Sequence, residues 1–196
     1  MRKIRVRRWA QNTLAVAVLL GTVSLVRAVV LAPGACVGLI GTTAAVRPEL
    51  AGVALQDNLI PFTITDAAGN PCFQGVVQDR VVKSTLTGAL HFCFRIRDTA
   101  PSLPCCLVSV ARTGFDTGVT DVDFRLDGLG TIGPPLACRT AAGDEVDFYF
   151  NPCLPAGSDS YFVFVITRAE DFNQVGTLTL TTDNGSSVTL AVAGPL

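Results

Sequence analysis

The stretch Ala89-Leu-His-Phe-Cys-Phe-Arg-Ile-Arg97 carries an apolar side chain at every even position, namely Leu90, Phe92, Phe94 and Ile96. Side chains alternate between the two faces of a strand, so this period of two predicts a strand with one buried face. The same parity recurs along the rest of the chain, at Val122, Phe124, Leu126, Val146, Phe148, Phe150, Phe162, Phe164, Ile166, Leu178, Leu180, Val188, Leu190 and Val192. We therefore predict an all-β domain.

Turn-forming residues divide the chain into eight or nine such strands. Strands at this spacing, joined by short turns, predict an antiparallel β-sandwich of immunoglobulin-like or jelly-roll-like type. In Ser160–Thr167 both sets of alternating side chains are apolar, so this strand should be central and covered on both faces. The predicted strands are 73–83, 89–97, 106–112, 120–126, 145–151, 160–167, 177–182 and 187–192, with a further alternation at Ile60, Phe62 and Ile64.

The sequence Asp183-Asn-Gly185 predicts a hairpin with a three-residue loop. A two-residue Asn-Gly loop would place Leu180 opposite Thr189, an apolar residue against a polar one. A loop over 183–185 instead pairs Thr182 with Ser186 and Leu180 with Val188. Gly185 then occupies the left-handed position, so we expect it to have a positive φ.

The first 28 residues have the pattern of a secretory signal. A basic start precedes the charge-free apolar run Thr13–Val26, which predicts cleavage after Ala28. Two other kinds of export signal fit less well. The Arg7-Arg8 pair lacks the flanking residues of a twin-arginine signal. The stretch that ends at Cys36 is similar to a lipoprotein cleavage site, but it has Pro33 where that motif has a leucine-like residue. We predict a signal peptide at 1–28, an irregular lead at 29–46 and a β-sandwich domain at 47–196.

Removal of the signal changes the charge of the chain. Six of the fifteen basic residues leave with it, so nine remain against sixteen acidic residues and the mature chain has a net charge of −7. Such a surface repels nucleic acid, which we do not expect as a partner. Contact with a membrane is expected only through an uncleaved signal or a lipidated Cys36.

All seven cysteines follow the predicted cleavage site, which makes them disulfide candidates in an oxidising compartment. An odd number leaves at least one thiol unpaired, and sequence alone does not choose among the possible pairings. Structural zinc is disfavoured because the chain has no C-x-x-C motif and a single histidine. The candidates are Cys36, Cys72, Cys93, Cys105, Cys106, Cys138 and Cys153.

Catalytic motifs are weak, and we predict that the chain is not an enzyme and needs no cofactor. His91 and Cys93 share one face of a strand, the minimum for a thiol nucleophile. No third residue orients them, however, and we expect Cys93 in a disulfide and His91 on a solvated face. There is no G-x-S-x-G sequence for a serine hydrolase.

Acidic residues offer the weak metal candidates Asp121, Asp123 and Asp127. With Asp144, Glu145 and Asp147 they would form a calcium cluster if their loops met, because calcium takes several oxygen ligands. Arg125 stands where an EF-type loop needs a ligand. We therefore expect solvated carboxylates on the polar side of a strand, and no metal.

Several short motifs resemble the exported β-sandwich domains of bacterial surface proteins of the PEP-CTERM or choice-of-anchor type. The resemblance covers most of the mature chain and implies an extracellular or cell-surface location without an established activity. The chain has no hydrophobic sorting tail at 193–196, so we expect no such anchor. The motifs are Leu59–Phe62, Gly75–Lys83, Thr87–Arg97, Gly114–Arg125, Glu145–Asn151, Leu154–Gly157, Tyr161–Thr167 and Asp171-Phe172.

These features predict a secreted or cell-surface protein with a structural or adhesive role, whose partners would be envelope or matrix proteins or glycans. One alternative is a carbohydrate- or ligand-binding module with an exposed aromatic patch from Tyr149, Tyr161, Phe115 or Phe172. Another is a fibre or pilus subunit in which a terminal strand, Ser187–Val192, pairs with a neighbouring chain.

Overall fold

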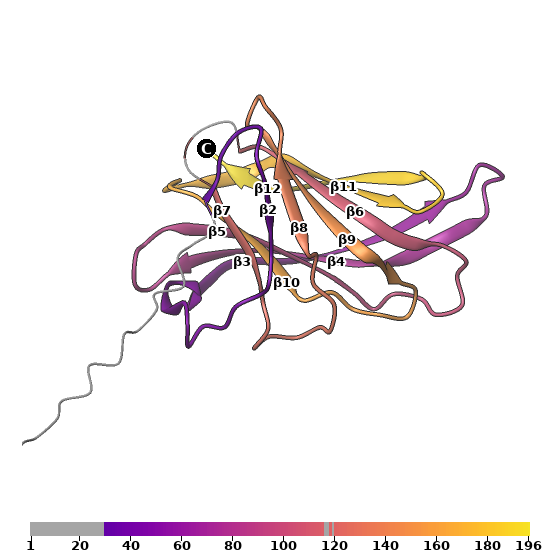
Figure 1. The fold of residues 1–196 in the computed structure, drawn as a ribbon, viewed down its shortest axis with the longest axis horizontal. Helices are drawn as coiled ribbons and strands as arrows, with labels where there is room; N and C mark the ends of the chain where they lie inside the picture. The colour runs from indigo at the N-terminus through magenta and orange to yellow at the C-terminus, as the bar shows by residue number, and fades with distance from the viewer. Residues whose placement is uncertain (1–29, 116–117, 119) are drawn as a thin grey trace, which may run out of the picture.

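The computed structural model describes residues 30–115, 118 and 120–196, and the predicted signal peptide with its cleavage after Ala28 lies outside them. These residues form two antiparallel six-stranded sheets, stacked as the layers of a β-sandwich (Figure 1). The first sheet has the order β1-β7-β10-β5-β4-β3 and the second β12-β11-β6-β9-β8-β2. The all-β prediction is therefore confirmed. Within the described residues, no helix is long and apolar enough to span a bilayer.

The strands agree closely with the predicted alternation, except that there are twelve in the described residues where we expected eight or nine. The additional strands are short edge or near-edge pieces, which carry too few residues for a period of two to be visible. Their bounds are β1 Val30–Leu31, β2 Cys36–Gly38, β3 Gly52–Thr65, β4 Pro71–Ser84, β5 Leu90–Arg97, β6 Cys106–Thr113, β7 Thr120–Arg125, β8 Leu136–Arg139, β9 Glu145–Pro155, β10 Phe162–Ile166, β11 Phe172–Thr182 and β12 Ser187–Pro195, with a 3-10 turn, η1, at Pro48–Leu50.

The segment 29–46, which we expected to be an irregular lead, is irregular over most of its described residues but contains two short strands, β1 and β2. Leu31 is fully buried, and β1 pairs with β7 at the edge of the first sheet. β2 then pairs with β8 at the edge of the second sheet, so this segment crosses the open side of the sandwich. Both pairings depend on strands more than 80 residues away, as Val30↔Asp121 shows, and local sequence does not indicate them.

The core lies between the sheets and includes all the even-numbered positions of β5, together with buried apolar side chains from both sheets. Phe94 packs edge-on against Phe148 of the second sheet, with ring centroids 5.4 Å apart. β10 lies between β5 and β7, which confirms that it is a central strand. Its odd residues Val163 and Val165 face the inter-sheet core, whereas Phe162 and Phe164 belong to a separate cluster. Parity alone left open which of the two sets faces the core.

A buried ion pair crosses this core. Asp79 of β4 and Arg112 of β6 are both fully buried, and an Arg112 Nη2 donates to Asp79 Oδ1 over 2.8 Å. Arg112 also donates to the backbone carbonyls of Cys93 and Ala193, while Asp79 Oδ2 accepts from the backbone N–H of Ala193 and from Gln56. The pair thus connects three strands of the first sheet to two of the second.

The predicted hairpin register between β11 and β12 is confirmed. Leu180 pairs with Val188 and Leu178 with Leu190, and the backbone N–H of Thr182 donates to the carbonyl of Ser186. Gly185 has a φ of 83°, as a three-residue loop requires.

We expect Gly185→Val to lower the free energy of unfolding by about 1–2 kcal/mol, through left-handed backbone strain. Nothing lies within 4 Å of a Cβ built at this position, so no steric contact adds to the strain. Urea denaturation of both proteins measures the difference. Gly185→Asn is the matched control and should lose less, because Asn tolerates this conformation. Equal stability of the Val variant and the parent protein would contradict the expectation.

Candidate functional site

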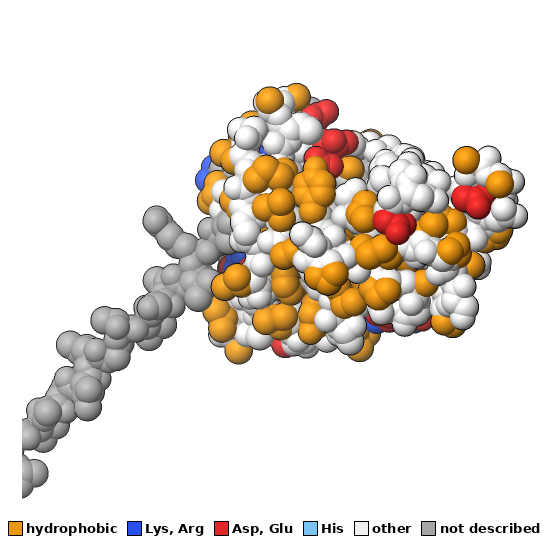
Figure 2. Space-filling model, turned by 45° about the vertical axis from the view of Figure 1, so that its right-hand side comes forward, with side chains coloured by type: hydrophobic (Ala, Val, Ile, Leu, Met, Phe, Trp, Pro, Cys, Tyr) orange, Lys and Arg blue, Asp and Glu red, His pale blue; other side chains and the backbone are white. Residues whose placement is uncertain are grey.

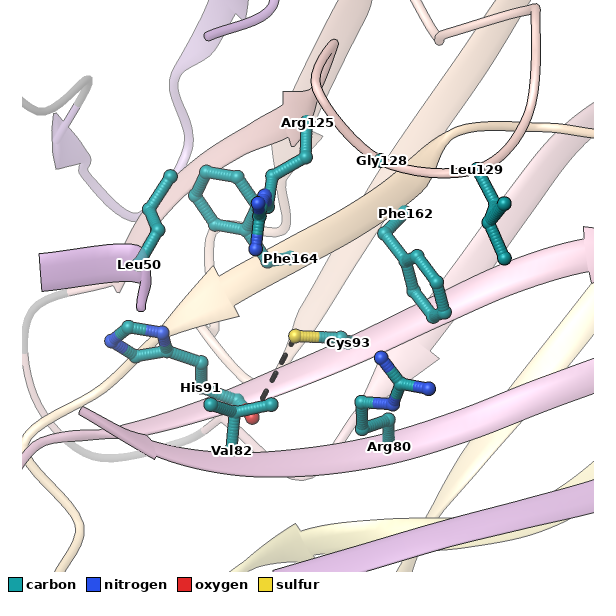
Figure 3. Close-up of a pocket in the computed structure, with 10 residues that line it drawn as sticks. All are labelled: Leu50, Arg80, Val82, His91, Cys93, Arg125, Gly128, Leu129, Phe162 and Phe164. Carbon is teal, nitrogen blue, oxygen red and sulfur yellow. Dashed lines mark hydrogen bonds between the residues drawn. The ribbon is translucent and has the colours of Figure 1, made fainter. Parts of the chain in front are cut away.

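A hollow lined mainly by apolar side chains lies on the outer face of the first sheet, outside the main core (Figure 3). It has a volume of about 190 Å³. Its floor consists of Val82 from β4, Cys93 from β5, and Phe162 and Phe164 from β10. The floor residues are neighbours because β10 pairs with β5 in the register Phe164↔Cys93. Leu50 of η1 and Leu129 of the loop after β7 form walls.

Residues 39–51, which we call the strap, cover part of this outer face. The strap forms a parallel bridge to β7 at Thr42↔Arg125 and then continues through η1 to the start of β3. Arg47, which belongs to the strap, is 2 % exposed, and its guanidinium carbon lies 5.5 Å from the ring centroid of Phe164. Leu50 is 4 % exposed and packs in the cluster with Cys93 and Phe164. The strap therefore shields an outer sheet face that would otherwise be solvated.

The three candidate metal ligands hold the strap in place. Asp121 pairs with Arg47 over 2.6 Å, Asp123 accepts from the backbone N–H of Gly41, and Asp127 accepts from that of Ala44. Asp121 and Asp123 are buried, so the expectation of solvated carboxylates is wrong. The strap is the reason, since it removes both from water.

These surroundings shift the pKa values of Asp123 and Asp127 in opposite directions. Burial raises the pKa of Asp123, against the effect of its backbone hydrogen bonds from Phe124 and Gly41. The hydrogen bond from Arg125 is the main cause that lowers the pKa of Asp127. Asp144, Glu145 and Asp147 belong to the region of β9 in the second sheet and do not join them. No group of three His, Cys, Asp or Glu side chains suited to a metal occurs among the described residues.

His91 and Cys93 line the hollow but do not form a catalytic dyad. The hydrogen bond of the Cys93 thiol goes to the backbone carbonyl of His91 over 3.9 Å, drawn dashed in Figure 3. Burial raises the pKa of Cys93 to about 12. Burial, followed by the charge of Arg47, lowers the pKa of His91 to about 4. At neutral pH the thiol is protonated and the imidazole is neutral, the reverse of an activated pair.

The expectation that His91 lies on a solvated face is wrong. The side chain is 1 % exposed, and its Nε2 is a buried atom without a hydrogen-bond partner in the part of the chain that the structure describes. Leu50 of η1 and His91 line the same hollow (Figure 3). The strap covers His91, and no sequence pattern within β5 indicates that this face of the strand is covered.

We expect acid to destabilise the protein through His91. Because its pKa is lowered from 6.5 to about 4, the unfolded chain binds a proton in this range that the native protein does not. The stabilisation by neutral His91 is present above pH 6.5 and is lost as the pH falls toward 4, by about 3 kcal/mol in all. Urea denaturation at several pH values measures it. In His91→Leu the free energy of unfolding should decrease by about 3 kcal/mol less between pH 6.5 and pH 4. If the plots of unfolding free energy against pH are parallel for the two proteins, the assignment to His91 is contradicted.

Six of the seven cysteines form disulfides, in the pairs Cys36–Cys138, Cys72–Cys105 and Cys106–Cys153. Cys105 and Cys106 are adjacent yet bond to different strands, β4 and β9, because successive side chains point to opposite sides. The expectation of a bridge at Cys93 is wrong, since Cys93 is the free and buried thiol. Three disulfides are typical of a chain that folds in an oxidising compartment.

The four aromatic candidates for a carbohydrate platform do not form a patch. Phe115 is fully buried and packs against Phe92. Tyr161 stacks on Phe124 with ring centroids 5.7 Å apart, and Phe172 is partly buried against the core. Tyr149 alone is exposed, at 38 %, on β9. An aromatic platform for sugars therefore lacks support in this fold.

The sequence analysis did not identify Arg80, Arg125, Phe162 and Phe164 as site residues. Their signal in the sequence is the second set of apolar side chains in Ser160–Thr167. The two arginines lie on β7, which is next to β10, and on β4, which is one strand further away beyond β5, so only the strand order brings them to these rings. The chain matches no family model, no curated protein and no solved structure.

Proposed function

We propose that this chain is an exported, non-enzymatic β-sandwich of immunoglobulin-like or jelly-roll-like type. Its role would be structural or adhesive, at the cell surface or in the extracellular space, after cleavage of residues 1–28. The observation that carries the proposal is the set of three disulfides, which connect β2 to β8, β4 to the segment before β6, and β6 to β9. Such crosslinks resist unfolding outside the cell, where no chaperone repairs a damaged chain.

Two further observations support this role. The histidine and the free thiol are both buried and in their uncharged forms, which leaves the hollow without an activated nucleophile. Hydrophobic side chains are spread over the face shown in Figure 2, with few charged side chains among them. Where such side chains adjoin one another, the exposed apolar surface is suited to contact with other macromolecules.

Export and adhesion are tested together in the producing cell. The full chain should appear outside the cytoplasm with Val29 as its first residue and the mass of a protein with three disulfides. A strain without the gene should attach less well to a surface, and the full chain should restore attachment, whereas a version without residues 2–28 should not. Retention in the cytoplasm with an intact N-terminus, or unchanged attachment, would refute the proposal.

Assembly by strand addition is a second candidate, favoured by the position of β12 at the edge of the second sheet. Thr182 and Ser186 form a hydrogen-bonded pair, so the alternation places the N–H of Thr189 on the open side of β12. Thr189→Pro should abolish any concentration-dependent polymerisation, because proline removes this donor at a position where an edge strand tolerates it. Thr189→Val keeps the donor and is the control. A parent protein that stays monomeric at all concentrations would reject this candidate.

A further inference from the structure

The hollow on the outer face of the first sheet is large enough for a small molecule. Its volume of about 190 Å³ exceeds that of engineered protein cavities of about 150 Å³ that admit benzene. The rings of Phe162 and Phe164 and the side chain of Val82 provide apolar contact. Leu129 is 63 % exposed at the rim, so the hollow opens to solvent on that side.

Two guanidinium groups reach the hollow from opposite sides, Arg125 from β7 and Arg80 from β4 (Figure 3). Arg80 lies against the floor, with its guanidinium carbon 4.5 Å from the ring centroid of Phe162. Both charges act on the thiol of Cys93, where they oppose the effect of burial on its pKa. The positive charge is therefore close to the apolar floor.

Both arginines retain unused donors. Arg125 uses its Nε on Asp127 over 2.9 Å, and its two terminal nitrogens have no hydrogen bond to any described residue. Arg80 uses one terminal nitrogen on Asp57 over 2.7 Å, while its Nε is buried without a partner among the described residues. The two terminal nitrogens of an arginine form the fork that binds a carboxylate through both oxygens.

No acidic side chain lines the hollow within the described residues. A cation would therefore meet two guanidinium groups and no acidic side chain in the lining, because Asp57 and Asp127 pair with the arginines from outside the hollow. An anion would instead meet the terminal nitrogens that these pairs leave unused. An inorganic anion would leave the rings of Phe162 and Phe164 uncovered. An apolar molecule without a charge would leave the donors of Arg80 and Arg125 unpaired.

We propose that this hollow binds a small organic carboxylate with a compact aromatic body, of about the size of benzoate. The carboxylate would receive hydrogen bonds from the terminal nitrogens of Arg125 and from the terminal nitrogen of Arg80 that does not pair with Asp57. The aromatic body would lie on Phe162, Phe164 and Val82. This site is independent of the structural or adhesive role proposed above, because it needs neither export nor assembly.

Isothermal titration calorimetry of the purified, oxidised protein tests the proposal with benzoate as the probe. Benzyl alcohol has the same ring without the charge, and inorganic phosphate has charge without the ring. Benzoate should bind at a single site, and each of the other two should bind at least about tenfold more weakly, because a hydrogen bond to a charged group contributes about that factor. The absence of benzoate binding, or equal binding of either comparison molecule, would overturn the proposal.

Variants locate the binding. Arg125→Gln should weaken benzoate binding about tenfold or more, since it removes the fork. Arg97→Gln is the matched control, because Arg97 pairs with Asp98 at the surface and does not line the hollow. Val82→Phe should abolish binding by filling the space above the floor. Circular dichroism and thermal unfolding establish that each variant is folded. Unchanged binding in folded Arg125→Gln or Val82→Phe, or an equal loss in Arg97→Gln, would overturn the assignment.

Discussion

Arg112→Met is expected to lower the free energy of unfolding by about 3–5 kcal/mol, because it leaves the carboxylate of Asp79 buried without its ion-pair partner. Both side chains of the pair are 0 % exposed. The variant also deprives the carbonyls of Cys93 and Ala193 of a donor. Urea denaturation at neutral pH measures the loss.

The control for this prediction is Arg97→Met. Arg97 forms an ion pair with Asp98 at the surface, where such pairs contribute about 0–1 kcal/mol. The double variant Asp79→Leu, Arg112→Met removes both charges and should be more stable than Arg112→Met alone, because no buried charge stays unpaired. Two outcomes would contradict the role of the pair in joining the sheets. In one, Arg112→Met lowers the free energy of unfolding no more than Arg97→Met does. In the other, the double variant is no more stable than Arg112→Met alone.

Loss of the disulfide Cys36–Cys138 is the second large expected effect. It closes a loop with a sequence separation of 102 residues, and removal of a crosslink over such a loop is expected to cost about 4–5 kcal/mol. The double variant Cys36→Ser, Cys138→Ser tests this by urea denaturation. It should also weaken the pairing of β2 with β8, since the two cysteines are directly opposite in that pair.

Cys93→Ala is the control, because Cys93 closes no loop. It should lose far less stability than the disulfide variant. Thiol titration of the unfolded, unreduced protein should find one thiol in the parent protein and none in Cys93→Ala. Three or more thiols in the parent would show that one of the bridges does not form, and a disulfide variant as stable as the parent would contradict the loop argument.

The strands themselves were predictable because alternation is a property of the local backbone. Leu90, Phe92, Phe94 and Ile96 are all buried between the sheets, as their parity indicates. Parity also excluded the two-residue loop at Asn184-Gly185, and the observed register agrees. These conclusions need only the fact that neighbouring side chains on a strand point to opposite faces.

The sequence contains a signal for the buried ion pair. Asp79 stands between Val77 and Val81, which both face the core, and Arg112 has the parity of Val110. When a charged residue occupies a strand position whose side chain faces the core, either it has a partner of opposite charge or the strand has been assigned the wrong register. Sequence alone does not reveal that the two residues meet, because they come from different sheets and are brought together only by the packing of the layers.

The sequence by itself determined the all-β class, the course of the main strands and the hairpin at 182–186, since each rests on contacts between near neighbours or on strand parity. The tertiary structure alone decided the disulfide pairing, the burial of His91 and Asp123, and the hollow beside Cys93. The burial of His91 and Asp123 depends on the strap, the disulfide pairing depends on the order and packing of the strands, and the hollow depends on both. In each case residues some 30 to 100 positions apart come into contact. Local patterns carry no information about which distant segment covers a strand face, and that cover sets the exposure, charge state and partners of these side chains.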